Sequence, residues 1–108
     1  MVVELLIDVQ SALKRIPARF AGINTPEDFT KSETGMVKFD AICMVLIAVG
    51  ETVKTIDRKT NGSLFSKYPG VNWKGIKGVR DVIAHGYFTV DEGDIFTICK
   101  TDVPAPLS

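Results

Sequence analysis

The chain has 108 residues, of which 45% are hydrophobic and 24% charged, with 13 basic and 13 acidic side chains. This length fits one domain, residues 1–108, and the composition lacks the bias of a disordered or fibrous protein. A net charge of zero argues against wholesale electrostatic capture of nucleic acid. The two cysteines, Cys43 and Cys99, have no CxxC or CxxH spacing, and we interpret them as reduced core residues.

The first residues lack a signal-peptide pattern, because charged side chains already occur at Glu4 and Asp8. The longest apolar run, residues 41–50, is too short to span a bilayer. We therefore expect a cytoplasmic protein with no membrane contact. The sequence shows no clustered metal ligands, and we predict neither a metal site nor a cofactor.

The first predicted element is a helix over residues 2–20. Apolar residues recur there every three or four positions, and Pro17 is expected to kink or shorten the helix. Thr25 and Pro26 then predict the N-cap and first position of a short helical element that stops before Gly35.

The longest periodic segment spans residues 36–59 and is apolar over more than one face, so we expect a central helix that ends at Asn61. Its strongly polar residue among apolar neighbours is Glu51, which follows Gly50. A glutamate there is either exposed on the remaining polar stripe or buried with a partner. We favour a structural hydrogen-bonding role for Glu51 over a catalytic one.

A further amphipathic helix is predicted to begin at Trp73, capped by Asn72, and to end near Gly86. The residues expected on its apolar side are Ile76, Val79, Val82 and Ile83. Gly75 and Gly78 weaken this helix and suggest the close approach of another backbone. The alternative is a weak helix that is simply tolerated.

The remaining segments predict shorter elements. We expect a helical turn over residues 63–68, a loop at Pro69, and a last helix that Asp91 caps and that ends before Pro104. No segment shows convincing strand alternation, so the predicted fold class is all-α.

The segment from Arg80 to Tyr87 contains the only histidine of the chain, His85. Cleavage of a phosphodiester needs a proton acceptor near neutral pH, a cation for the developing negative charge, and a donor that holds the phosphate. Histidine, arginine and tyrosine can supply these three functions. The alternatives are a lone histidine that caps a helix or lies on the surface, and an Asp81 that is a surface acid rather than a group orienting Arg80 or His85.

Arg80 and His85 do not face the same side of a regular helix, because residues five apart differ by about 140° in direction. They converge only if the helix loosens near Gly86 or if two chains share the site. Cleavage by the 2′-hydroxyl of RNA also needs both a base and an acid, and each chain has one histidine. Both points favour a two-fold dimer with this helix at its interface.

Charge is unevenly distributed along the chain. Residues 52–87 carry seven basic and two acidic side chains, whereas residues 1–51 sum to −2 and residues 88–108 to −3. The basic excess therefore surrounds the arginine and histidine, as phosphate binding would require. The alternative is a set of solvated helix faces.

The residue pattern from Tyr68 to Asp91, with Arg-x4-His-x-Tyr inside it, closely resembles the HepT-type toxins of the HEPN superfamily. Gly50-Glu51 is similar to a recurrent Gly-Glu pair in the long helix of that family, and residues 102–104 are similar to its Asp-Leu-Pro. The resemblance implies an up-and-down bundle of four or five helices that dimerises through its motif-bearing helices. It also implies that the last helix is truncated in this chain.

The implied function is that of a metal-independent RNA endonuclease, the toxin of a type VII-like toxin–antitoxin pair. Arg80 would stabilise the phosphate and His85 would act as general acid and base, leaving a cyclic phosphate, with Asp81 and Glu51 as supporting residues. The implied antitoxin is a minimal nucleotidyltransferase that adds AMP to Tyr87. Such a bulky anionic group beside the site would repel RNA and block Arg80.

Two other functions remain open. Related helical proteins serve as non-catalytic partners, or adaptors, of nucleotidyltransferases, and a structural helical dimer could carry a vestigial site. The intact set of Arg80, His85 and Tyr87 disfavours the adaptor.

Overall fold

The computed structural model describes residues 2–61, 63 and 73–102. Over these residues the regular structure is entirely helical, which confirms the all-α expectation for this part of the chain. The elements are α1 (Val2–Leu13), α2 (Ile16–Phe20), η1 (Pro26–Phe29), α3 (Glu33–Thr60), α5 (Trp73–His85), η2 (Tyr87–Thr89), α6 (Glu92–Thr97) and the π-helical turn η3 (Ile98–Asp102).

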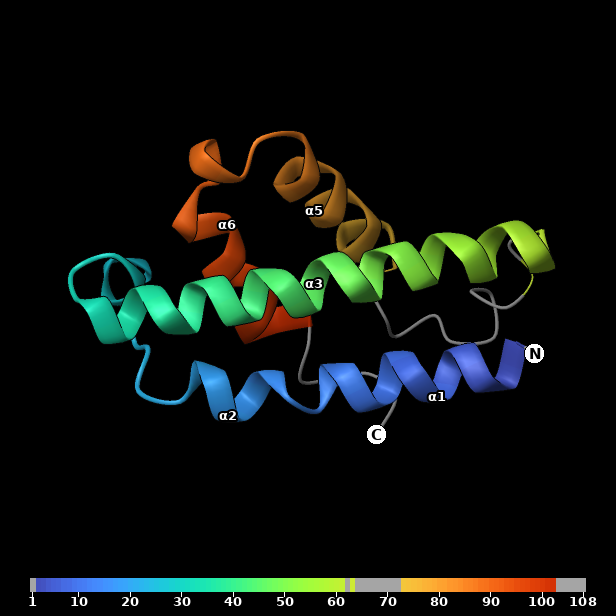
Figure 1. Cartoon of the computed structure of the whole chain (residues 1–108), viewed down its shortest axis with the longest axis horizontal. Helices are drawn as coiled ribbons and strands as arrows, with labels where there is room; N and C mark the ends of the chain where they lie inside the picture. Colours follow the sequence, from blue (N-terminus) through green and yellow to red (C-terminus); the bar gives the residue numbers. More distant parts are fainter. Residues whose placement is uncertain (1, 62, 64–72, 103–108) are drawn as a thin grey trace.

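The long helix α3 is the axis of the molecule (Figure 1). Its 28 residues span about 42 Å at 1.5 Å per residue, close to the longest dimension of the 41 × 28 × 20 Å molecule. Helices α1 and α2 run antiparallel to α3 along one side, and α5 and α6 lie on the other (Figure 1). No helix in the described ranges combines the length and apolar character needed to cross a membrane.

The core lies where these layers meet α3. Its largest fully buried side chains are Phe29, Ile16, Ile42, Leu46, Ile56, Ile76, Ile83 and Ile95. Each contributes about 1.5–3 kcal/mol relative to an exposed position. The apolar periodicity of the sequence therefore places α3 and α5 against each other and fixes the position of the motif-bearing helix.

Pro17 divides the predicted helix over residues 2–20 into α1 and α2. A proline ring clashes with the carbonyl group four residues earlier, here that of Leu13, which is the last residue of α1. The N–H of Arg15 then donates to the carbonyl of Ala12 at 3.1 Å in a tighter turn. Pro17 thus shortens the first helix, and α2 starts with this proline in its first turn.

The central helix begins earlier than predicted, at Glu33 rather than at residue 36, and contains Gly35 in its first turn. The side chain of Ser32 caps it by accepting a hydrogen bond from the N–H of Gly35 at 3.0 Å. A Cβ atom at Gly35 would lie 2.1 Å from the carbonyl oxygen of Asp28. Glycine therefore acts here as a contact point that lets α3 start directly against η1, not as a helix breaker.

The far end of α3 and the cap of α6 agree with the sequence prediction. Asn61 ends α3 in a left-handed conformation with φ of 51°. The Asp91 side chain caps α6 by accepting a hydrogen bond from the N–H of Gly93 at 2.7 Å. Of the turn predicted over 63–68, all but Ser63 lies outside the described residues, as do the loop at Pro69, the Asn72 cap and the end at Pro104.

Both cysteines are free and buried, as predicted. Burial is the main cause that raises the pKa of Cys43 and of Cys99 to about 12. The two groups therefore remain neutral thiols within the core at physiological pH, and neither is a nucleophile.

Helix α5 ends at His85, before Gly86, as predicted, but two expectations about it were wrong. Val82 is 52% exposed instead of buried, because its side of α5 faces an open groove rather than a packed helix. The expected close approach is also absent at Gly78, where an added Cβ would meet no atom within 4 Å.

The close approach occurs instead at Gly50, in the middle of α3. A Cβ atom there would lie 2.2 Å from the Cβ of Arg80 and 2.6 Å from its Cγ. Helix α5 therefore crosses α3 at Gly50, and the aliphatic stem of Arg80 fills the space where a side chain would stand. This crossing therefore sets the position of α5, the helix that contains Arg80 and His85, relative to α3.

Gly50→Ala is expected to lower the free energy of unfolding by about 1–3 kcal/mol, because the new methyl group overlaps Arg80 and forces α5 away from α3. Gly78→Ala is the matched control, since it adds the same methyl group to a helix in open space. That substitution should leave the stability unchanged or raise it by up to ~1 kcal/mol. Urea denaturation measures both, and equal stabilities of the two variants would contradict the crossing.

Candidate active site

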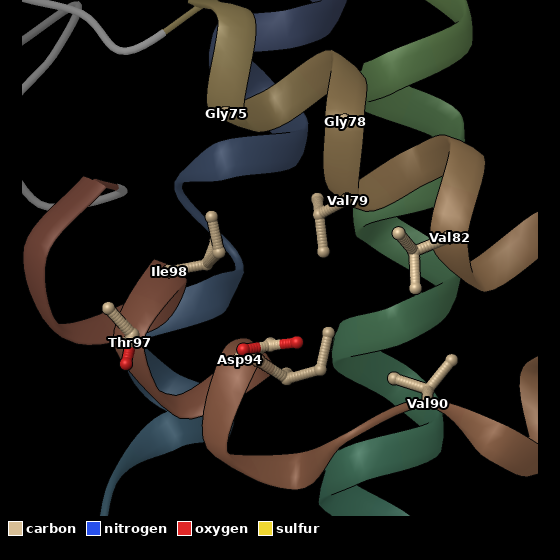
Figure 2. A pocket seen from close by; sticks show the side chains of 9 residues that line it. Gly75, Gly78, Val79, Val82, Val90, Asp94, Thr97 and Ile98 are labelled. Atoms are coloured by element: carbon tan, nitrogen blue, oxygen red, sulfur yellow. The ribbon is translucent and has the colours of Figure 1, made fainter.

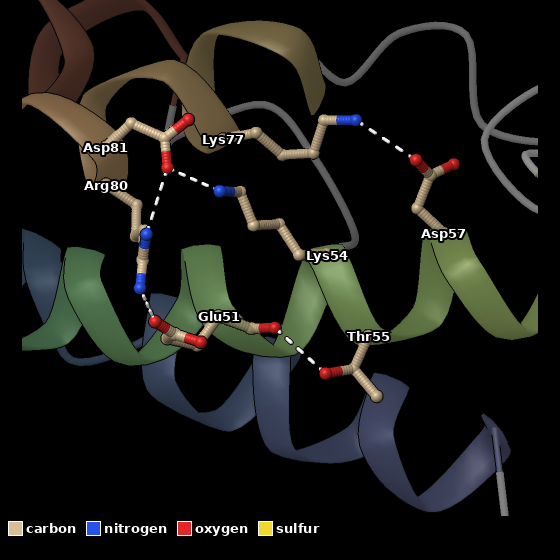
Figure 3. Close-up of polar contacts among 7 residues, drawn as sticks. All are labelled: Glu51, Lys54, Thr55, Asp57, Lys77, Arg80 and Asp81. Carbon is tan, nitrogen blue, oxygen red and sulfur yellow. Dashed lines mark hydrogen bonds and ion pairs between the residues drawn. The ribbon is translucent and has the colours of Figure 1, made fainter.

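Two carboxylates hold Arg80, one from each of the two crossing helices (Figure 3). Its Nη2 contacts Oε1 of Glu51, and its Nη1 donates a hydrogen bond to Oδ1 of Asp81 at 3.0 Å. The Nε atom is buried and has no hydrogen-bond partner among the described residues. The orientation of the guanidinium thus depends on its two Nη groups, each of which keeps a second N–H.

Gly50 and Glu51 act together in this arrangement. Gly50 gives room to the stem of Arg80, and the next residue supplies the carboxylate for its charged end. The Glu51 side chain is 52% exposed, so it lies on the polar stripe of α3 and also has a partner. Of the two possibilities left open by the sequence, exposure on the polar stripe is the one observed, and the exposed carboxylate nevertheless has Arg80 as a partner.

Asp81 joins Arg80 to a second cation. Its Oδ1 also contacts Nζ of Lys54, and Lys77 on α5 forms a further ion pair with Asp57 at 3.1 Å (Figure 3). Lys54, followed by Arg80, is the main cause that holds the pKa of Asp81 below its usual range. Part of the basic excess in this segment therefore joins α5 to α3. Within the described part of the chain, Asp81 pairs with Arg80 and forms no hydrogen bond or ion pair with His85.

His85 lies exposed at the C-terminal end of α5. Its side chain forms no hydrogen bond or ion pair with any residue that the structure describes. Positions 78, 82 and 85 follow the spacing of one helix face, so His85 shares the exposed face of Gly78 and Val82. Arg80 is on the face toward α3. A single chain therefore does not bring Arg80 and His85 together.

A groove of about 310 Å³ opens between α5 and α6 beside this exposed face (Figure 2). Its lining is mostly apolar and consists of Gly75, Gly78, Val79, Val82, Val90, Asp94, Ile95, Thr97 and Ile98. Because Gly78 has no side chain and an added Cβ would meet no atom within 4 Å, α5 does not fill the groove at this point.

Tyr87 lies in η2, on the other side of Gly86 from the helix. Its hydroxyl donates a hydrogen bond to Oδ1 of Asp40 on α3, and its half-buried ring has its centroid 6.3 Å from that of Phe39. Asp40 escaped the sequence prediction because 47 residues separate it from Tyr87. In the sequence, Asp40 looks only like an acidic residue on the polar side of the central helix.

The described residues contain no group of three or more histidine, cysteine, aspartate or glutamate side chains that could hold a metal ion. The charged groups gathered here are Glu51, Lys54, Arg80 and Asp81, two anions and two cations. This arrangement offers guanidinium N–H donors for an anion, with an exposed imidazole on another face of the same helix.

Comparison with known proteins gives a consistent family. The family described as "Ribonuclease HepT-like" matches residues 9–106. The protein named "Putative RNase MJ1380" from Methanocaldococcus jannaschii is 33% identical over 69 residues, which are 64% of this chain and 59% of that protein. "Putative RNase MJ0127" from the same organism is 30% identical over 99 residues, which are 92% of this chain and 75% of that protein.

The similarity covers the relatives unevenly. The chain spans little more than half of two of them, 59% of MJ1380 and 52% of "Putative RNase MJ0125". The latter is 33% identical over 64 residues, or 59% of this chain. No solved structure matches the chain at a comparable level of significance.

The ion pairs of Asp81 predict a specific dependence of stability on pH. Because the pKa of Asp81 is lower in the folded chain than in the unfolded chain, its contribution is full above the unfolded pKa and disappears as the pH falls through the folded value. The difference in melting temperature between wild type and Asp81→Asn should therefore be largest near neutral pH and shrink below about pH 4.

Asp8→Asn is the control for this measurement. It removes the same charge from α1, where Asp8 forms no ion pair within the described residues. Thermal denaturation between acidic and neutral pH measures all three proteins. A difference between wild type and Asp81→Asn that stays constant with pH would contradict the ion pairs.

Proposed function

Since the chain belongs to the HepT-like ribonuclease family, we propose that it is a metal-independent RNA endonuclease and the toxin of a type VII-like toxin–antitoxin pair. The observation that carries the proposal is the set of ion pairs around the Arg80 side chain. Two carboxylates anchor it while one N–H on each Nη remains for a phosphate, and an exposed histidine lies on the same helix. Bidentate guanidinium donors of this kind match phosphate geometry.

The proposed reaction uses the 2′-hydroxyl of the RNA as nucleophile. His85 removes the proton of this hydroxyl, and the bond from O2′ to phosphorus forms while the bond from phosphorus to O5′ breaks. A general acid returns a proton to O5′, which leaves a cyclic phosphate and a free 5′-hydroxyl. Arg80 stabilises the negative charge that develops on the phosphoryl oxygens.

We further propose that the active form is a HEPN-like bundle that dimerises through α5. One imidazole cannot be at O2′ as base and at O5′ as acid at the same moment, because these oxygens lie on opposite sides of the phosphorus, and His85 does not face Arg80 of its own chain. The exposed face of Gly78, Val82 and His85, with its apolar groove, favours contact with a second copy. A two-fold axis beside this face gives one cleft with two histidines and two arginines.

The proposed antitoxin is a minimal nucleotidyltransferase that adds AMP to Tyr87. Tyr87 is two residues from His85, and the phosphate of an attached AMP would place an anion beside the cleft. This anion would compete with RNA for Arg80 and repel the RNA backbone. Inhibition would therefore need no change in the fold.

The competing function is that of a non-catalytic partner of a nucleotidyltransferase. Such a partner would need the same surface around Tyr87. It would not need free donors on Arg80 or an exposed His85. The arrangement of those two residues supports the nuclease over the adaptor.

His85→Ala is expected to lower RNA cleavage in EDTA by at least about 100-fold, the usual contribution of a general acid or base. Purified wild type and variant are incubated with a mixed RNA pool, and the 3′ ends of the products are analysed. Cyclic phosphate should form with wild type alone. Because His85 is exposed, the variant should keep its stability within about 0.5 kcal/mol.

Equal cleavage by wild type and His85→Ala would mean that His85 is not the base. Cleavage by neither would favour the adaptor, once intact mass has shown that Tyr87 carries no AMP.

Tyr87→Phe is expected to keep the fold and most of the cleavage activity but to escape modification. The ring of phenylalanine preserves the packing against Phe39, and only the hydroxyl is lost. Intact-mass measurement after co-expression with the nucleotidyltransferase should show the mass of AMP on wild type and not on the variant. The same level of AMP on the variant would exclude Tyr87 as the target.

A further inference from the structure

Asp40 and Tyr87 form a pair that the proposed cleavage step, with His85 as base and Arg80 as phosphate ligand, does not use. We propose that Asp40 is the proton acceptor that makes the Tyr87 hydroxyl a nucleophile for nucleotidyl transfer. This inference rests on the proposed modification of Tyr87 and names a second residue for it. It starts from the hydrogen bond that the hydroxyl of Tyr87 donates to Oδ1 of Asp40.

The position of Tyr87 is fixed by its surroundings. Its ring centroid lies 6.3 Å from that of the buried Phe39 and 5.5 Å from that of Phe88, which meets it in an edge-on arrangement. The turn η2 is closed by hydrogen bonds from the Thr89 hydroxyl to the carbonyl of Gly86 at 2.9 Å and from the Val90 N–H to the carbonyl of Tyr87. The phenol oxygen is therefore held at one place on α3 with its proton directed at Asp40.

The Asp40 carboxylate supplies the proton acceptor that a tyrosine nucleophile needs. A tyrosine hydroxyl has an ordinary pKa of about 10, so it is protonated at neutral pH and nucleophilic only when a neighbouring group takes the proton. Asp40 is exposed to solvent and does not need Tyr87 to compensate for burial. It can pass the proton on to water after the transfer.

The surface beside the pair explains why a partner is needed. Tyr87 forms part of the wall of an open pocket of about 210 Å³ between the start of α3 and η2. The lining residues include Met36, Phe39 and Phe88, and the charged residue among them is Glu92. This wall contains no lysine or arginine, so the charge of a triphosphate must be neutralised by the transferase. Asp40 and Tyr87 then contribute the acceptor and its base.

The proposed step balances as follows. The oxygen of Tyr87 attacks the α-phosphorus of a nucleoside triphosphate, and the bond from that phosphorus to the β-phosphate oxygen breaks. Pyrophosphate leaves, a tyrosine–phosphate ester forms, and the phenolic proton passes to the Asp40 carboxylate. The nucleoside triphosphate is the co-reactant that the transferase binds.

The test uses an aryl sulfonyl fluoride, a reagent that modifies the phenol oxygen and releases fluoride without any protein partner. Tyr87 should react about 100-fold more slowly in Asp40→Asn than in wild type, because asparagine cannot take the proton. Peptide mapping by mass spectrometry follows Tyr87 separately from Tyr68, the other tyrosine of the chain. Reaction at Tyr68 should be the same in both proteins, and Asp8→Asn should behave as wild type at both tyrosines.

A second variant distinguishes a base from a purely structural contact. Replacing Tyr87 with difluorotyrosine makes the phenol more acidic, so it loses its proton without help. In the Asp40→Asn background, this replacement should recover at least about tenfold of the lost rate. Wild-type reactivity of Tyr87 in Asp40→Asn, or a loss that fluorination does not recover, overturns the proposal.

Modification by the nucleotidyltransferase separates this inference from the proposed function. AMP on wild type, with a rate about 100-fold lower on Asp40→Asn, supports both. AMP at the same rate on both proteins overturns the role of Asp40 and leaves the modification of Tyr87 intact. No AMP on wild type overturns both. Cleavage of RNA by Asp40→Asn should remain at the wild-type level.

Discussion

The arrangement of the site depends on one crossing between two helices. At Gly50 the backbone of α3 has no side chain, and the stem of Arg80 on α5 lies where one would stand. The guanidinium then reaches Glu51 on α3 and Asp81 on α5, and two lysine–aspartate pairs join the same helices beside it. Single ion pairs at this exposure are worth at most about 1 kcal/mol each. Their value lies in fixing the direction of Arg80, whereas apolar burial of Ile76 and Ile83 supplies the stability.

This crossing separates the two residues that we propose for cleavage, Arg80 and His85. Because α5 presents Arg80 to α3, the opposite face of α5, with Gly78, Val82 and His85, is directed away from α3. One chain therefore presents the proposed phosphate-binding group, Arg80, and the proposed proton-transfer group, His85, on different faces of α5. In the proposed dimer, a second copy beside the exposed face would resolve this separation and would provide the second histidine for acid and base catalysis. Tyr87 donates a hydrogen bond to Asp40 on α3, and in the proposed dimer an anion added to its hydroxyl would lie beside that cleft.

The sequence predicts those features that depend on neighbouring residues. Helix periodicity, the Thr25 and Asp91 caps, the end of α3 at Asn61 and the end of α5 before Gly86 all follow from local rules. The features it does not predict depend on contacts between distant segments. A glycine that marks a helix crossing looks the same in sequence as one that faces open space, so Gly50 and Gly78 could not be distinguished. Val82 has the spacing of a core residue, and Asp40 meets Tyr87 only through the fold.

The central claim, that two copies complete the site, is tested most directly by the cleavage rate per chain over a wide range of protein concentration. Sedimentation velocity on the same samples gives the fraction of dimer. If Arg80 and His85 act across two chains, the rate per chain falls in proportion to the dimer fraction and disappears in the monomer. A monomer that cleaves RNA at the full rate would contradict the claim.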